Sequence, residues 1–252
     1  MTTSPASSPS RPQGGKDQDP DFVHRAFSSI AKRYVVTNHF LSLGIDVLWR
    51  KKVASLVSAD DPRIILDVAT GSGDLAMAVQ KENPEARVIA TDFCAPMLEE
   101  ARKRGLRDLL VADGLRLPFS DNSVDALTIG YGLRNMADWG AALIEFSRVL
   151  KPGGRLVVLD FSLPSHALLR SPYRFYLHRV LPRIAGWLTG NREAYAYLGD
   201  SIERFPSGAE MQKLIEANGF EPADWYPQMG GISSVYSARA KDEEAPLASL
   251  SS

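Results

Sequence analysis

Short apolar runs alternate with segments of helical period through most of this chain, and that alternation restricts the architectures it can adopt. Six runs rich in branched aliphatic residues span 63–68, 87–91, 108–112, 124–130, 155–161 and 232–238. Helix-period segments at 75–81, 97–104, 139–150 and 211–217 lie between or beside them. Apolar runs of this length between helices are typical of parallel strands buried on both faces. The repeated strand–helix unit therefore predicts a doubly wound α/β sheet.

The two ends of the chain and two internal segments do not follow this alternation. Residues 1–20 and 241–252 predict disordered tails around a single domain at 21–240. Residues 22–59 predict a helical extension before the first strand. Residues 162–205, rich in Tyr, Arg, Leu and Pro, predict a helical insertion after the fifth strand. Because open α/β sheets bind ligands at the carboxyl ends of their strands, we expect this insertion to form a lid there.

Two local signals predict helix boundaries. Ser207 and Glu210 stand at the positions of a capping box, which predicts the start of the last helix. The stretch Lys151-Pro-Gly-Gly154 predicts the end of the helix before it, because proline and glycine interrupt helical structure.

Composition excludes several classes of function. The 252 residues carry 29 Lys and Arg against 30 Asp and Glu, and a net charge of −1 provides no field for nucleic-acid binding. We interpret the basic clusters 50–52 and 102–104 as solvated helix faces. A single cysteine, Cys94, excludes an intrachain disulfide framework. The four histidines have no metal-ligand spacing, so no metal is expected.

The sequence also bears on localisation. No apolar stretch approaches the roughly 18–20 residues of a membrane span, and residues 1–20 resemble neither a signal peptide nor a transit peptide. We therefore expect a cytoplasmic protein. Residues 168–188 mix Leu, Tyr, Phe and Trp with arginines that could rest on a bilayer surface. Peripheral contact with the inner face of the membrane and ordinary helix packing are both open interpretations, and so is a homodimer.

A glycine turn links the first predicted strand to the helix after it. Gly71-x-Gly73-x-x-Ala76 has the spacing of a nucleoside-cofactor loop, in which Gly71 allows a tight turn and Gly73 lets the backbone approach a ligand. Asp92, nineteen residues after Gly73, ends the second strand, where a carboxylate can accept hydrogen bonds from both hydroxyls of a ribose. The combination predicts a nucleoside site. The alternative is a tight turn with a capping aspartate.

Acidic residues around this turn distinguish between candidate cofactors. Asp67 lies four residues before Gly71, at the mouth of the site. A carboxylate there is unfavourable beside the pyrophosphate of NAD(H) and favourable beside the ammonium of S-adenosylmethionine. Asp113-Gly114 follows the third strand, within reach of an adenine amino group, and Phe93 and Met97 can pack on the adenine ring. Charge therefore favours the methyl donor.

Several longer stretches carry a resemblance to a known family. They are Gly132-Leu-Arg-Asn135, Arg148-Val-Leu-Lys-Pro-Gly-Gly154, Leu117-Pro-Phe-x-Asp121, Phe27-Ser-Ser-Ile-Ala and Tyr195-x-Tyr197-Leu. The core resembles the class I S-adenosylmethionine-dependent methyltransferases, and residues 22–240 are similar to the ubiquinone/menaquinone biosynthesis C-methyltransferase family. The resemblance implies a seven-stranded sheet, mostly parallel with its last strand antiparallel. It also implies methylation of a polyprenyl quinol, either demethylmenaquinol or a ubiquinone precursor.

The resemblance implies cofactor contacts at Ser72, Asp92, Asp113, Gly114 and Gly130. The argument from charge agrees, since it assigns Asp67 to the methionyl ammonium, Asp92 to the ribose and Asp113 to the adenine. With Gly71 and Gly73 in the turn and Phe93 beside the adenine, these residues make up the predicted cofactor site.

Arg134 and Asn135 are the predicted catalytic residues, because they follow the fourth strand at the edge where ligands bind. A quinol ring carbon becomes more nucleophilic when the adjacent hydroxyl ionises. Arg134 cannot itself be the base, but it can stabilise the developing negative charge or hold a water that takes the proton. Asn135 can hydrogen-bond the same oxygen. The alternative for Arg134 is a structural clamp on a neighbouring carboxylate. The resemblance adds substrate contacts at Tyr195 and Tyr197.

The chain departs from the family's pattern at Val35, Thr37 and Asp46, where an acid, a methionine and a histidine are usual. The sequence leaves open whether the substrate is a benzoquinone or a naphthoquinone. Methylation of another small phenolic or aromatic metabolite is the alternative function.

Overall fold

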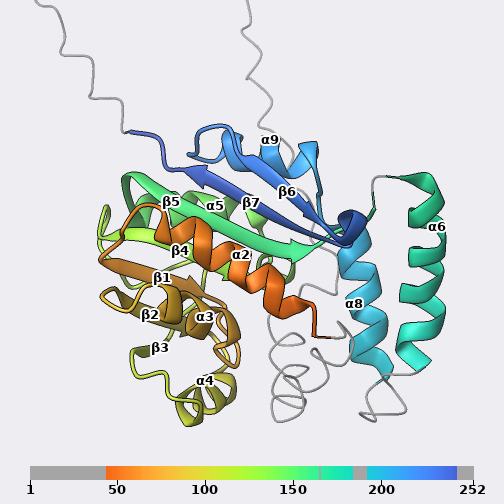
Figure 1. Ribbon diagram of the computed structural model, residues 1–252, viewed down its shortest axis with the longest axis horizontal. Coiled ribbons are helices and arrows are strands. Elements are labelled where there is room, and N and C mark those ends of the chain that lie inside the picture. Colours follow the sequence, from red (N-terminus) through yellow and green to blue (C-terminus); the bar gives the residue numbers. More distant parts are fainter. Residues whose placement is uncertain (1–43, 165, 184–191, 243–252) are drawn as a thin grey trace, which may run out of the picture.

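A computed structural model describes residues 44–164, 166–183 and 192–242 (Figure 1). The side chains of 167 and 192–197 lie outside this description, although both positions belong to helices. The predicted tails lie outside it too, apart from residues 241 and 242, as does the predicted helical extension up to residue 43. Among the described helices, none is long and apolar enough to cross a membrane.

Seven strands form one sheet in the order β3-β2-β1-β4-β5-β7-β6. Their bounds are β1 (Ile64–Val68), β2 (Arg87–Asp92), β3 (Leu109–Val111), β4 (Val124–Gly130), β5 (Leu150–Phe161), β6 (Asp224–Gln228) and β7 (Ser233–Arg239). The pairs from β3 across to β5 are parallel, and β7 is antiparallel to both of its neighbours. The predicted doubly wound sheet with an antiparallel last strand is confirmed.

Helices cover both faces of this sheet (Figure 1). One face carries α2 (Asp46–Ser58) and α3 (Asp74–Glu82), with α4 (Ala95–Lys103) beside β2 and β3; the other carries α5 (Trp139–Val149) and α9 (Ala209–Ala217). Because successive strand residues point to opposite faces, Leu66 and Leu127 join one core and Ile65 and Ala126 join the other. The apolar runs are continuous because both faces are buried.

The insertion after β5 folds into helices beside the carboxyl end of that strand (Figure 1). It contains α6 (Ala167–Phe175), the π-helical turn η3 (Tyr176–Val180) and α8 (Arg192–Arg204). Leu177, Leu181 and Ile202 form a small separate core against Phe161. Helix α8 also packs against η2 (Leu133–Asn135), which follows β4. The insertion lies where a lid was predicted; its closing function stays a prediction.

Strand β6 has no counterpart among the predicted apolar runs. It pairs only with β7, at the edge of the sheet, and its residues are half-buried or exposed. Pro227 stands inside it, which a central strand would not tolerate but an edge strand does. An edge strand with a proline lacks the apolar run that identifies buried strands.

The predicted capping box is wrong. Helix α9 is preceded by Gly208, with a φ of 60°, and no side chain caps it. Instead the Gly208 amide donates a hydrogen bond to the Tyr236 hydroxyl at 2.7 Å, and a Cβ at Gly208 would lie 3.1 Å from the Trp225 ring. Contacts with β6 and β7 therefore determine how the chain enters the helix.

The helix before Lys151-Pro-Gly-Gly154 ends at Val149, one residue before the predicted end. The stretch itself begins strand β5, where Leu150 pairs with Val124 and the register shifts before Arg155 pairs with Ala126. The proline and glycines thus stop the helix, and they also belong to the irregular start of the next strand.

Candidate functional site

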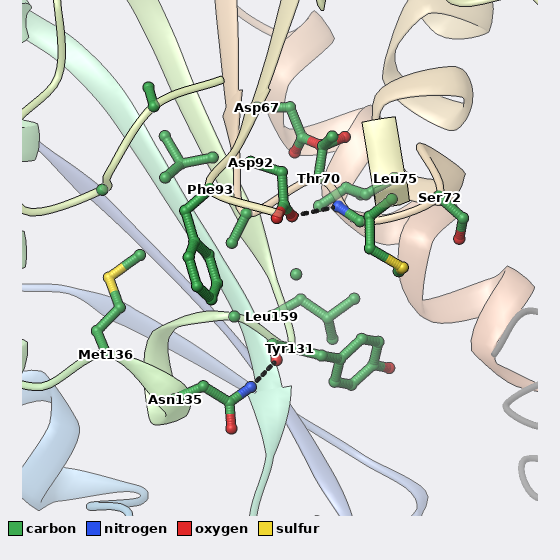
Figure 2. A pocket seen from close by; sticks show the side chains of 18 of the residues that line it. Asp67, Thr70, Ser72, Leu75, Asp92, Phe93, Tyr131, Asn135, Met136 and Leu159 are labelled. Carbon is green, nitrogen blue, oxygen red and sulfur yellow. Dashed lines mark hydrogen bonds between the residues drawn. The ribbon is translucent and has the colours of Figure 1, made fainter. Parts of the chain in front are cut away.

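A cavity of about 220 Å³ opens at the carboxyl ends of β1, β2 and β4 (Figure 2). Its lining contains nine of the predicted site residues: Asp67, Gly71, Ser72, Asp92, Phe93, Asp113, Gly114, Gly130 and Asn135. These residues come from four segments of the chain, 67–72, 92–93, 113–114 and 130–135, which the parallel sheet brings to one edge.

The glycine turn connects β1 to α3 with three left-handed residues, Ala69 at a φ of 51°, Gly71 at 56° and Gly73 at 83°. Gly71 lines the cavity, and its amide donates to Oδ2 of Asp92 at 2.8 Å. Gly73 does not line it. A Cβ at Gly73 would lie 2.3 Å from Cδ1 of Leu106, so the close approach there is to the loop after α4. Gly73 is thus closely packed inside the protein, and the approach of its backbone to a ligand stays a prediction.

Asp67, in β1, is completely buried at the base of the cavity. Its Oδ1 accepts a hydrogen bond from Thr128 Oγ1 and its Oδ2 from Thr70 Oγ1, both at 2.5 Å. Burial raises the pKa of the carboxyl from its ordinary value to about 6, although these hydrogen bonds oppose the change. A buried carboxylate held by two hydroxyls is suited to a cationic ligand group.

Asp92 is the last residue of β2 and connects the glycine turn to the next helix. Its Oδ2 accepts from the Gly71 amide and its Oδ1 from the Cys94 amide, each at 2.8 Å. Cys94 directly precedes α4 and provides no side-chain cap. The Asp92 carboxylate thus organises both loops that border the cavity.

The β2–β3 end of the cavity is less polar. Phe93 is 38% exposed and Met97 is buried, and both line the cavity with Gly114. A Cβ at Gly114 would lie 2.5 Å from Cε of Met136, so an added side chain would displace the end of the Met136 side chain. Asp113 lies exposed beside them, and its Oδ1 accepts from the Leu115 amide at 2.9 Å. A flat apolar surface next to a carboxylate is the arrangement predicted for an adenine.

Arg134 and Asn135 lie next to each other in η2 but face different surroundings. Arg134 is buried outside the cavity lining, and its Nη1 donates to Oδ1 of Asp160 at 2.7 Å and to the Tyr131 carbonyl at 2.5 Å. This is the ion pair that the clamp interpretation predicts, whereas substrate contact by Arg134 stays a prediction. Asn135 does line the cavity, and its Nδ2 donates to the Tyr131 carbonyl at 3.2 Å (Figure 2).

Tyr131 is a cavity residue that the sequence analysis did not select. Its backbone has a φ of 60°, which is a strained conformation for a bulky side chain. Residues in such strained conformations cluster at functional sites. Its ring packs on Phe161 with 4.6 Å between centroids, and burial raises the pKa of its hydroxyl above the ordinary value. Its place between two glycines directly after a buried strand was the available signal.

The interpretation of the basic clusters as solvated faces is wrong for Arg50, whereas Arg104 in the other cluster is exposed but also holds a turn. Arg50 is 8% exposed and lines the cavity, although Lys51 beside it is exposed. Arg104 donates through Nη1 to the Ser72 carbonyl at 2.9 Å and through Nη2 to Oδ1 of Asp74 at 2.8 Å. It therefore holds the glycine turn from outside.

Arg102 and Lys103, next to Arg104, form only surface ion pairs, with Glu99 and Glu100. Helical spacing gave a signal for Arg50: Val53, Ala54 and Val57, three, four and seven residues later, are all completely buried. No comparable signal marked Arg104.

Tyr195 and Tyr197 belong to helix α8, but their side chains lie outside the described residues. Their contact with substrate therefore stays a prediction. In the described part of the chain, no three His, Cys, Asp or Glu side chains form a group that could hold a metal ion.

The charges around the cavity fit S-adenosylmethionine. Among the described lining residues, four carboxylates accompany a single cation: Asp67, Asp74, Asp92, Asp113 and Arg50. A pyrophosphate would meet repulsion in such a lining, whereas an ammonium, a sulfonium and ribose hydroxyls find acceptors. The residues present therefore match the methyl donor that the sequence predicted.

Known proteins agree with this assignment. Residues 13–240 match the ubiE/COQ5 methyltransferase family. The chain is 42% identical over 214 residues to the demethylmenaquinone methyltransferase of Deinococcus radiodurans, covering 83% of this chain and 89% of that protein. It is 46% identical over 199 residues to the protein of the same name from Thermus thermophilus, covering 77% and 90%.

Solved structures share the fold at low sequence identity. A SAM-dependent methyltransferase from Thermotoga maritima has a TM-score of 0.62 and 20% identity, covering 86% of this chain and 99% of its own. Human N-acetylserotonin methyltransferase, solved in complex with SAM, has a TM-score of 0.55 and 16% identity, covering 80% and 55%. The predicted fold, methyltransferase activity and methyl donor are thereby confirmed, and the chain belongs to the ubiE/COQ5 methyltransferase family.

Proposed function

We propose that this enzyme methylates a ring carbon of a polyprenylated quinol, either demethylmenaquinol or the corresponding ubiquinone precursor. One observation carries the proposal: the chain matches about nine-tenths of the length of two proteins named demethylmenaquinone methyltransferase, at 42% and 46% identity. The stretches that resemble the quinone family at Gly132–Asn135 and Arg148–Gly154 support it. They lie next to the cavity or hold the loops around it.

In this proposal the described carboxylates hold the methyl donor. Asp67 accepts a hydrogen bond from the methionyl ammonium, and Asp92 accepts hydrogen bonds from the ribose hydroxyls. Asp113 accepts one from the adenine amino group, while Phe93 packs on the adenine ring. When bound, S-adenosylmethionine supplies an electrophilic methyl group on its sulfonium. The cavity geometry supports this order, because Asp67 lies at the β1 end and Asp113 after β3.

Asn135 is the proposed contact to the quinol. Its Nδ2 donates to the Tyr131 carbonyl, which orients the amide at the cavity, and the same amide group is proposed to hydrogen-bond the ring oxygen. Arg134 is proposed as a positioning residue, because it donates to the same Tyr131 carbonyl. In the reaction the new bond joins the methyl group to the ring carbon, the sulfonium releases that methyl group, and the ring carbon loses a proton to solvent.

The insertion offers a surface for a membrane-resident substrate. Leu168, Leu169 and Phe175 on α6 are 90%, 50% and 64% exposed, and Met229 is 53% exposed. Leu169 lies close to Gly230, so the two segments form one apolar patch. We propose that this α6 patch rests on the cytoplasmic leaflet while the enzyme takes up its quinol.

Vesicle sedimentation tests the α6 patch. Leu168→Glu with Phe175→Glu should reduce binding to anionic phospholipid vesicles several-fold, whereas Ile144→Glu, at another exposed apolar side chain, should not. If the double variant instead changes the oligomeric state and leaves vesicle binding intact, the patch is a dimer interface and the membrane proposal fails.

The quinol proposal is tested with purified enzyme and methyl-labelled S-adenosylmethionine. Reduced demethylmenaquinol, a reduced demethyl benzoquinone precursor and a panel of simple phenols are each supplied, and products are identified by mass spectrometry. Products one CH₂ unit heavier from a polyprenyl quinol, but not from the phenols, support the proposal. Efficient methylation of the phenols alone would transfer the assignment to a small phenolic metabolite.

A further inference from the structure

Arg50 is a buried cation that the family motifs and the proposed roles do not use. It lies on α2, before the first strand, and its side chain is 9% exposed. Its Nη1 is 2.7 Å from Oδ2 of Asp46, one helical turn earlier, and the Asp46 side chain is 4% exposed. A buried arginine is costly unless its charge is compensated, so its place at the cavity needs an explanation.

Arg50 is at the opposite end of the cavity from the predicted adenine surface. Helix α2 packs against α3, β4 and β5, whereas Phe93 and Asp113 follow β2 and β3 at the other side of the sheet. The positive charge of Arg50 is close enough to oppose the rise that burial causes in the pKa of Asp67, and it contributes to the lowered pKa of Asp74. Arg50 therefore faces the end where the methionyl group of the cofactor would lie.

The methionyl group carries the only negative charge of S-adenosylmethionine. At this end of the cavity its carboxylate would meet Asp67 and Asp74 unless a cation intervened. Among the described lining residues, Arg50 is that cation. A guanidinium has five N–H donors in a planar fork, so an ion pair with Asp46 is compatible with a second, bidentate carboxylate.

We propose that the Arg50 guanidinium binds the methionyl carboxylate of S-adenosylmethionine, with Asp46 fixing its orientation. The ammonium then lies against Asp67. Arg50 on α2 thus binds the negative charge of the amino-acid group, and Asp67 on β1 binds its positive charge. This inference depends on the family's methyl donor and is independent of which acceptor the enzyme methylates.

The test compares two ligands by isothermal titration calorimetry without any quinol. S-adenosylhomocysteine carries the carboxylate, and S-adenosyl-3-thiopropylamine is the same molecule without it. Wild-type enzyme should prefer S-adenosylhomocysteine by about 10- to 100-fold, the range for a charge-assisted contact. In Arg50→Met this preference should fall to within about threefold, since the decarboxylated ligand never used the guanidinium.

Lys51→Met is the matched control, because it removes the same charge from the exposed neighbour on the same helix. It should keep the wild-type preference. The ratio of two affinities within one variant does not depend on how much of the sample is folded. Arg50→Lys covers the case in which the methionine variant does not fold, and it should show an intermediate ratio.

Two outcomes would overturn the proposal. If Arg50→Met weakens both ligands equally, Arg50 has only a structural role at the cavity. If the wild-type enzyme does not distinguish the two ligands, the carboxylate is not recognised. Failure to methylate any quinol would contradict the proposed function and leave these affinity ratios unchanged.

Discussion

The guanidinium of Arg134 and the carboxylate of Asp160 form an ion pair of 2.7 Å in which the two side chains are 3% and 1% exposed. The pair joins the turn after β4 to the end of β5, and the Arg134 amide also donates to Asp160 Oδ2 at 3.3 Å. Burial raises the pKa of Asp160, although Arg134 opposes that rise by stabilising the ionised form. The family-like stretch that contains Arg134 therefore has a buried structural partner, Asp160.

Arg134→Met should destabilise the protein by about 3–5 kcal/mol, because it leaves the Asp160 carboxylate buried without its arginine. Urea unfolding measures the loss, and adding Asp160→Asn should recover much of it. Single-turnover methylation by the folded fraction tests the catalytic prediction separately: in Arg134→Lys, a normal rate would show that Arg134 is a clamp alone.

Asp92→Ala should weaken binding of S-adenosylhomocysteine by about 10- to 150-fold, the value of a carboxylate bonded to two hydroxyls. It should also lower the melting temperature, since the amides of Gly71 and Cys94 lose their acceptor. Calorimetric titration measures the affinity. Asp108→Ala, which removes a surface carboxylate paired with Arg87, is the control and should change neither quantity strongly. Unchanged affinity in Asp92→Ala would refute the ribose assignment.

The affinity for the cofactor should depend on pH through Asp67. With a pKa of about 6 in the unliganded protein, this carboxyl must lose its proton to pair with an ammonium. Affinity should therefore fall below pH 6, approaching a tenfold loss for each further pH unit. Titrations between pH 7 and pH 5 should show this slope in the wild type and a flat profile in Asp67→Asn.

The same pKa gives a stability effect of opposite sign to that of a paired carboxylate. The folded protein binds the Asp67 proton more tightly than the unfolded chain, whose carboxyl has the ordinary value of 3.8. The contribution of Asp67 to the free energy of unfolding should therefore increase as the pH falls from about 6 towards 4. Urea unfolding of the unliganded proteins measures this: the free energy of unfolding of the wild type should rise relative to that of Asp67→Asn as the pH falls across this window.

Arg104→Ala should weaken cofactor binding about two- to fivefold, because the ion pair and hydrogen bond that hold the glycine turn are partly exposed and each contributes modestly. Arg102→Ala, two residues earlier in the last turn of α4, removes a surface pair with Glu99 and should leave the affinity unchanged. Equal affinities for the two variants would show that Arg104 does not support the turn.

Activity on the proposed quinol should require a chemical reductant. A reduced ring supplies electron density at carbon, and an ionising hydroxyl increases it, whereas the oxidised quinone carbon is electrophilic. The rate should therefore rise between about pH 6 and 8 as the hydroxyl ionises more readily. Anaerobic assays with and without reductant measure this, and equal rates on fully oxidised quinone would contradict the mechanism.

The sequence alone determined the sheet, the glycine turn and most of the cofactor side of the site. Strand β4 was predicted with its exact bounds, and Asp92 was placed at the end of its strand. These features are local: an apolar run, a glycine spacing and a helix period each lie within a few neighbouring residues. Parallel pairing then brings the strand ends together without further information.

Only the tertiary structure decided which charged residues belong to the site. Arg50 is buried and Lys51 is exposed, and Arg104 holds the glycine turn while Lys103 pairs on the surface. In the same way Asn135 faces the cavity while Arg134 faces Asp160. Residue type does not distinguish these neighbours, because the direction of each side chain depends on how its helix or turn is rotated against the sheet. That rotation is set by contacts between segments far apart in the sequence.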